Sequence, residues 1–199
     1  MSRNIIHTTG QHVFKYDPPQ YTEKGAPILA ENPENESEST ENDVKLQFLG
    51  QGYYFWDNNI KRAHKWGKSH YNGEYMIMEV PLCLQGDRFL DLIGSREDLM
   101  VFVDALKEVL KEIPNLKIGA FFHMMQTMEK YEAGAWPYSI VRALNVKSHA
   151  NKISFNHLPD SSMLLNPEII ICFYNKNDIN LQSIRFINRY NREWHQKTS

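Results

Sequence analysis

A run of six apolar residues at 169–174 (IIICFY) constrains the fold of this chain more than any other feature of its sequence. A helix that crosses a bilayer needs about 20 apolar residues, and this run is the longest in the chain. A short apolar run between polar residues is typical of a buried strand. We therefore predict a strand over 168–174 and expect no membrane-spanning segment.

Strand-like segments flank a helical middle. Residues 95–114 carry the clearest helix signal, because apolar residues recur at helical spacing after the capping-box-like Ser95–Asp98 and stop at Pro114. Further helices are predicted over 120–132 and over 58–66, the latter with Asp57 as its N-cap and Gly67 as its stop. The other predicted strands are 5–7, 53–56, 75–84, 139–144 and 183–187. This order predicts a mixed α+β domain rather than a βαβ repeat.

The composition indicates one globular domain over residues 1–199. The chain has 42% hydrophobic and 23% charged residues, which excludes a largely disordered or fibrous protein. A net charge of −2 does not indicate a nucleic-acid binder. The N-terminus lacks the apolar stretch of a secretory signal, and Cys83 and Cys172 form no CxxC pair. We therefore expect a cytoplasmic protein without a disulfide scaffold, and the His spacings indicate no metal site.

Two segments carry a strongly uneven charge. Residues 31–43 (ENPENESESTEND) contain six acidic residues and no apolar one, so we expect a mobile acidic loop. Residues 61–70 (KRAHKWGKSH) contain four Lys or Arg and no acidic residue. Such a run is most often a solvated face. Because this one directly follows an aromatic motif, it is also a candidate for contacts with phosphate groups.

Three separated segments become informative when they are taken together. They are His7-Thr8-Thr9, then Gly50-Gln51-Gly52-Tyr53-Tyr54-Phe55, and finally Asn166-Pro167-Glu168 with the apolar run after it. Their order resembles the ADP-ribosyltransferase superfamily, in the branch with a His–Tyr–Glu triad that includes diphtheria-like toxins and poly(ADP-ribose) polymerases. In that branch the aromatic motif leads into a short helix with an Ala, which Ala63 matches here. The resemblance covers both ends of the chain and the region around Tyr54, whereas residues 85–150 match no family pattern.

The resemblance implies a fold and a chemistry. The implied fold is a split antiparallel β-sheet core with flanking helices. The implied substrate is NAD, whose glycosidic bond to nicotinamide breaks through an oxocarbenium-like ribose. Glu168 is implied as the carboxylate that stabilises this charge, Tyr54 as the aromatic wall for nicotinamide, and His7 as the anchor for the adenosine ribose. Thr8, Thr9, Tyr53 and Trp66 are the further implied NAD-binding residues.

Some positions depart from the family pattern, and the sequence does not identify the acceptor of the ADP-ribose. Thr8 stands where the polymerases usually have Gly, and Lys65 stands where their second stacking Tyr is expected. The implied function is a mono-ADP-ribosyltransferase that modifies a protein or a nucleic acid. Bacterial toxins and phage-defence effectors often have this form, and a neutralising antitoxin is then a partner by analogy alone. The alternatives are an NAD glycohydrolase, a catalytically inactive nucleotide-binding module on the same fold, and an unrelated α+β domain.

Overall fold

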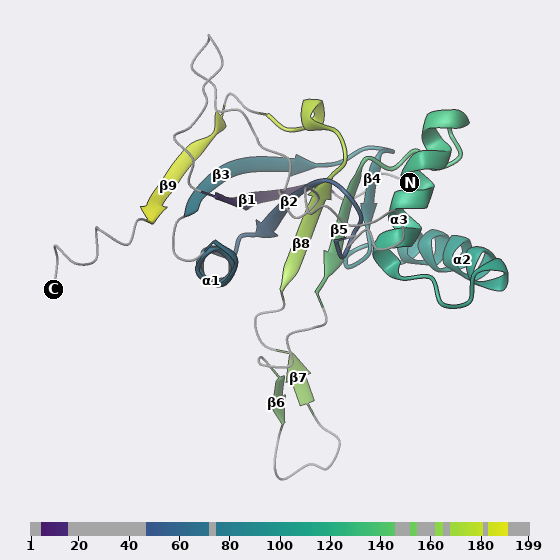
Figure 1. Cartoon of the computed structure of the whole chain (residues 1–199), viewed down its shortest axis with the longest axis horizontal. Coiled ribbons are helices and arrows are strands. Elements are labelled where there is room, and N and C mark those ends of the chain that lie inside the picture. The colour runs from purple at the N-terminus through teal and green to yellow at the C-terminus, as the bar shows by residue number, and fades with distance from the viewer. Residues whose placement is uncertain are drawn as a thin grey trace, which may run out of the picture.

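The computed structural model describes residues 5–15, 47–71, 75–145, 152–154, 162–164, 168–180 and 183–190. The acidic segment 31–43 lies outside these residues, so the prediction of a mobile loop stays a prediction. Within the described residues the chain is a mixed α+β fold around a seven-stranded sheet (Figure 1). The prediction of the α+β class is therefore confirmed. No described helix has both the length and the apolar character that crossing a lipid bilayer requires.

The large sheet has the strand order β4-β5-β8-β2-β1-β3-β9. All its neighbouring strands are antiparallel except β4 and β5, which are parallel. Its strands are β1 (Ile6–Lys15), β2 (Tyr53–Asp57), β3 (Tyr75–Leu84), β4 (Phe89–Asp91), β5 (Ile140–Leu144), β8 (Ile169–Phe173) and β9 (Arg185–Tyr190). The short strands β6 (Lys152–Ser154) and β7 (Ser162–Leu164) form a separate antiparallel pair. The helices are α1 (Ile60–His70), α2 (Arg96–Glu112), α3 (Ile118–Tyr131) and the short 3-10 helix η3 (Lys176–Asp178).

The predicted helix ends are correct for α2 and wrong for α1. Ser95 caps α2 by accepting a hydrogen bond of 3.1 Å from the Asp98 N–H. The N-cap of α1 is Asn59 rather than Asp57. Gly67 lies inside α1 and does not end it. The residue is a glycine because a Cβ at this position would lie 2.3 Å from the Tyr75 ring. Here the glycine allows close packing of helix and sheet, and it does not mark a helix end.

The three α-helices cover one face of the sheet (Figure 1). The helices α2 and α3 pack on a cluster at the β4–β5–β8 side of the sheet, and α1 packs on a smaller cluster at the β1–β3 side. Trp56 in β2 packs against both clusters, so the two groups of helices share this face. A third cluster, which includes Phe55, Met78 and Ile171, fills the opposite face.

His12 is a buried titratable residue in that third cluster. It is 2% exposed and lies among the rings of Phe14 and Phe55. Its Nδ1 donates a hydrogen bond of 2.7 Å to the Tyr54 carbonyl, which fixes the tautomer. Burial lowers the pKa of His12 below its ordinary value of 6.5, and the bond to Tyr54 offsets only part of this.

This burial predicts that the protein loses stability in mild acid. The unfolded chain binds a proton at His12 below pH 6.5, the ordinary pKa, whereas the folded chain does not until its lower pKa is reached. The contribution of His12 to the free energy of unfolding should therefore be complete above this pH and fall by at most about 1.4 kcal/mol per pH unit as the pH drops. Chemical denaturation across this range measures the slope. His12→Phe should reduce this slope. The control His123→Gln changes an exposed histidine and should leave the slope unchanged. Equal slopes in the wild type and His12→Phe would contradict the role of His12 in the acid sensitivity.

Candidate active site

Glu168 is a buried carboxylate directly before β8, which is an inner strand of the sheet. The whole residue is 6% exposed. Its Oε1 forms an ion pair with Arg62 of α1, and its Oε2 accepts a hydrogen bond of 3.2 Å from Asn145 Nδ2. The Asn145 N–H also donates to the Glu168 carbonyl at 2.8 Å. Because a buried charge is tolerated only with such partners, these contacts hold the carboxylate in one orientation.

Arg62 reaches Glu168 because the first turn of α1 is tied to β1. The Asn59 side chain accepts a hydrogen bond of 3.2 Å from the Arg62 N–H. The Asn59 N–H donates in turn to Gln11 Oε1 at 2.7 Å, and Gln11 is buried. A line of polar side chains therefore joins β1, α1 and β8 on the helix-covered face of the sheet.

Trp56 is on the same face of the sheet as this carboxylate, and Trp66 of α1 lies against Trp56. Trp56 pairs with Ile170, two residues beyond Glu168, so it is the diagonal neighbour of Glu168 on the same face at roughly 7–8 Å. Trp66 follows Arg62 by one helical turn, which places both side chains on one side of α1. The ring centroids of Trp56 and Trp66 are 6.1 Å apart, and His70 stacks on Trp66 at 3.6 Å. The candidate site thus has a half-buried aromatic wall.

The structure places Tyr54 away from Glu168. Tyr54 pairs with Cys172, four residues from Glu168 along the chain, which is about 13 Å at the rise of a strand. Its hydroxyl donates to the Gly50 carbonyl at 2.5 Å and accepts from the Leu49 N–H at 2.9 Å, so it fixes the turn before β2. Tyr53 packs in the cluster on the opposite face. Neither tyrosine forms an aromatic wall beside the carboxylate.

His7 and Glu168 lie at the same end of the sheet. The Asn58 N–H donates to the Thr9 carbonyl at 2.7 Å, and the β2–β8 register continued by two residues puts Glu168 level with Asn58. His7 is exposed and lies two residues beyond Thr9 on the same side of β1. Two strand spacings and two residues separate His7 from Glu168, which is about 12 Å. The structure thus brings His7, Thr9 and Glu168 to this end of the sheet. Trp66 lies further along, because the next residue, Gly67, packs on Tyr75, which pairs with Lys15 at the other end of β1.

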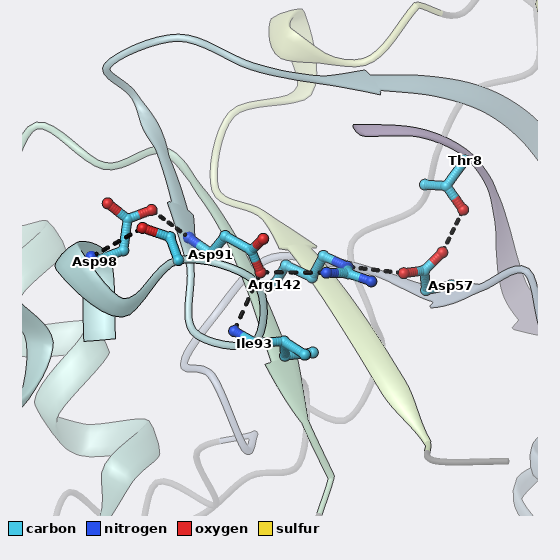
Figure 2. Close-up of polar contacts among 7 residues, drawn as sticks. Thr8, Asp57, Asp91, Ile93, Asp98 and Arg142 are labelled. Atoms are coloured by element: carbon cyan, nitrogen blue, oxygen red, sulfur yellow. Dashed lines mark hydrogen bonds and ion pairs between the residues drawn. The ribbon is translucent and has the colours of Figure 1, made fainter. Parts of the chain in front are cut away.

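The Thr8 side chain belongs to a polar network on the opposite face of the sheet. Its hydroxyl donates to Asp57, and Arg142 Nε donates to the other Asp57 oxygen at 2.8 Å. Arg142 Nη1 donates to Asp91 at 3.3 Å, as Figure 2 shows. The Asp91 N–H donates to Asp98 at 2.9 Å, which connects the network to the first turn of α2. Asp57 therefore joins strands through Arg142 instead of capping α1.

A cavity of about 200 Å³ lies at the other end of the sheet. The Gly-x-Gly motif contributes Gln51 and Gly52 to its lining. The structural reason for Gly52 is a close approach, because a Cβ there would lie 2.6 Å from Cys172 Sγ. The full lining is Gln51, Gly52, Tyr53, His123, Gln126, Thr127, Lys130 and Tyr174. Neither His7 nor Glu168 lines this cavity.

No sequence motif singles out Arg62, Asn145 or Trp56 as a site residue. A signal for Arg62 exists, because it lies in the basic segment 61–70. A signal for Trp56 also exists, since the alternation along β2 puts it on the face of Tyr54 and two residues closer to Glu168. No local pattern marks Asn145, whose position depends on the pairing of β5 with β8.

Comparisons with protein-family models, with curated proteins and with solved structures find no match for this chain. Among the described residues, no group of three or more His, Cys, Asp or Glu side chains is arranged to hold a metal ion.

Proposed function

We propose that this protein is an NAD-dependent ADP-ribosyltransferase of the His–Tyr–Glu type, on the fold that its three sequence motifs imply. It cleaves NAD between nicotinamide and ribose and transfers one ADP-ribose to a protein or a nucleic acid. The observation that carries the proposal is the buried carboxylate of Glu168, which Arg62 holds on the sheet face of Trp56 and at the same sheet end as His7. The three motifs also lead into or lie on β1, β2 and β8, which are neighbours in the sheet.

The proposed chemistry assigns Glu168 the central role. The bond between ribose C1′ and the nicotinamide nitrogen breaks, and its electron pair leaves with nicotinamide. Positive charge then develops on the ribose. Glu168 faces this charge and accepts a hydrogen bond from a ribose hydroxyl, an interaction that strengthens in the transition state. A nucleophilic oxygen or nitrogen of the acceptor forms the new bond to C1′ and releases its proton to solvent.

The binding roles follow from the same arrangement. Trp56, half-buried on the face of Glu168, supplies the apolar surface on which a nicotinamide ring packs. His7, about 12 Å from Glu168 by sheet geometry, is placed to bind the second ribose of an extended dinucleotide, with Thr9 between them. The exposed lysines of α1, Lys61, Lys65 and Lys68, offer positive charge for the diphosphate. In this proposal Tyr54 acts indirectly, by fixing the turn before β2.

The experiment that tests the proposed function follows both products of NAD cleavage. The purified protein is incubated with NAD labelled in its adenylate part, with and without a cell lysate or nucleic acid. We expect nicotinamide release together with label on a macromolecule. Nicotinamide release with free ADP-ribose only would make water the acceptor and the protein a glycohydrolase. No release under any of these conditions would contradict an enzymatic function.

One observation favours a second function, a non-catalytic nucleotide-binding module. Both oxygens of Glu168 already have partners in Arg62 and Asn145, which is also how a purely structural buried carboxylate is held. Under this alternative NAD binds without being cleaved. Isothermal titration with NAD, run beside the cleavage assay, separates the two functions.

A further inference from the structure

Arg62 forms an ion pair with the carboxylate on which the proposed function depends. The two side chains form an ion pair in which Arg62 is 13% and Glu168 is 7% exposed. A pair this well buried keeps its geometry, because separating it leaves an uncompensated buried charge. The planar guanidinium also has fixed donor directions, which orient a carboxylate better than a flexible ammonium group does.

Two contacts set the place of Arg62, and a third holds the carboxylate that it binds. Its N–H is bound to the Asn59 cap, and Asn59 is bound to the buried Gln11 of β1. Its guanidinium is bound to Glu168. On the far side of the carboxylate, Asn145 binds the other oxygen. Glu168 is therefore clamped between a helix and the end of β5.

The direction of Arg62 distinguishes it from the other cations of α1. Lys61, Lys65 and Lys68 are exposed and face solvent, where a diphosphate is accessible to them. The guanidinium of Arg62 is instead largely covered and engaged with the carboxylate. Its position thus suits orienting a side chain of the protein rather than binding phosphate from solvent.

We infer that Arg62 is a positioning residue for Glu168, which it holds with Asn145 in the orientation required beneath the ribose; this inference rests on the proposed function. Arg62 touches neither the reacting atoms nor the diphosphate, and it acts through the carboxylate. Loss of orientation lowers the rate of the chemical step, whereas the affinity for NAD depends on other residues. The two effects separate in steady-state kinetics.

The test measures kcat and KM for nicotinamide release in the full chain carrying Arg62→Gln, Arg62→Lys or Asn145→Ala. We expect Arg62→Gln to lower kcat about 10- to 100-fold, as a small displacement of a reacting group does, with KM changed less than about threefold. Arg62→Lys keeps the charge and should restore part of the loss. Asn145→Ala should lower kcat in the same manner. Arg88→Gln, which breaks an exposed Arg–Asp pair, is the matched control and should leave both constants unchanged.

Thermal unfolding of each variant accompanies the kinetics, so that lost activity is compared at equal folded fraction. An unchanged kcat in Arg62→Gln and Asn145→Ala would overturn the inference while leaving the proposed function intact. A raised KM at constant kcat would do the same and make Arg62 a binding residue. An inactive wild-type protein, or a Glu168→Gln variant as active as the wild type, would instead overturn the proposed function and this inference with it.

Discussion

Glu168→Gln is expected to lower the rate of nicotinamide release about 100-fold or more, because an electrostatic interaction made in the transition state contributes roughly 3 kcal/mol. The substitution keeps the size of the side chain and its capacity to accept from Asn145, but it removes the charge. The rate is measured under saturating NAD and expressed per folded molecule. Glu168→Asp keeps the charge at a shorter reach and should give an intermediate rate.

Asp178→Asn is the matched control for Glu168→Gln. Asp178 also forms a pair with an arginine, Arg88, but it lies in η3, which follows the end of β8 opposite to Glu168. Its neutralisation should leave the rate within about twofold of the wild type. Equal rates in Glu168→Gln and the wild type would show that the carboxylate takes no part in NAD cleavage.

Arg142→Met is expected to destabilise the protein by about 3–5 kcal/mol, because it leaves two buried carboxylates without their shared cation. The Asp57, Asp91 and Arg142 side chains are between 7% and 14% exposed. Arg142 binds both carboxylates across β2, β5 and β4 (Figure 2). Urea denaturation followed by fluorescence of the four tryptophans measures the change in the free energy of unfolding.

The triple variant Asp57→Asn, Asp91→Asn, Arg142→Met removes the three charges together and should regain a large part of this loss. Arg88→Gln breaks a pair in which the arginine is 58% exposed and should cost less than about 1 kcal/mol. A cost for Arg142→Met no greater than that for Arg88→Gln would contradict the structural role of the network.

Local sequence patterns predict most of the described secondary structure, because its causes are local. The strand 75–84 has the predicted bounds, and Ser95 caps α2 as its capping box indicates. The predictions fail where a long-range contact decides the role of a residue. Gly67 is typical of a helix end, but the Tyr75 ring pressed against it explains the glycine. Asp57 is a good cap residue, but Arg142, 85 residues away in sequence, binds it instead.

The candidate site also depends partly on local patterns and partly on long-range contacts. The three motifs together predict that the segments carrying them lie close together, and in the structure β1, β2 and β8 are neighbouring strands. The residue that faces Glu168 cannot be read from a motif, because register decides it: Trp56 is the diagonal neighbour and Tyr54 lies one further step away. Arg62 and Asn145 come from elements that meet Glu168 only after the sheet and α1 have formed.

A crystal structure of the protein with a non-hydrolysable NAD analogue tests the placement of NAD between Glu168 and His7. We expect the nicotinamide ring against Trp56, a ribose hydroxyl within hydrogen-bond distance of Glu168, and the adenosine ribose near His7. An analogue bound in the cavity lined by Gln51 and Lys130, or one that does not bind at all, would contradict this placement.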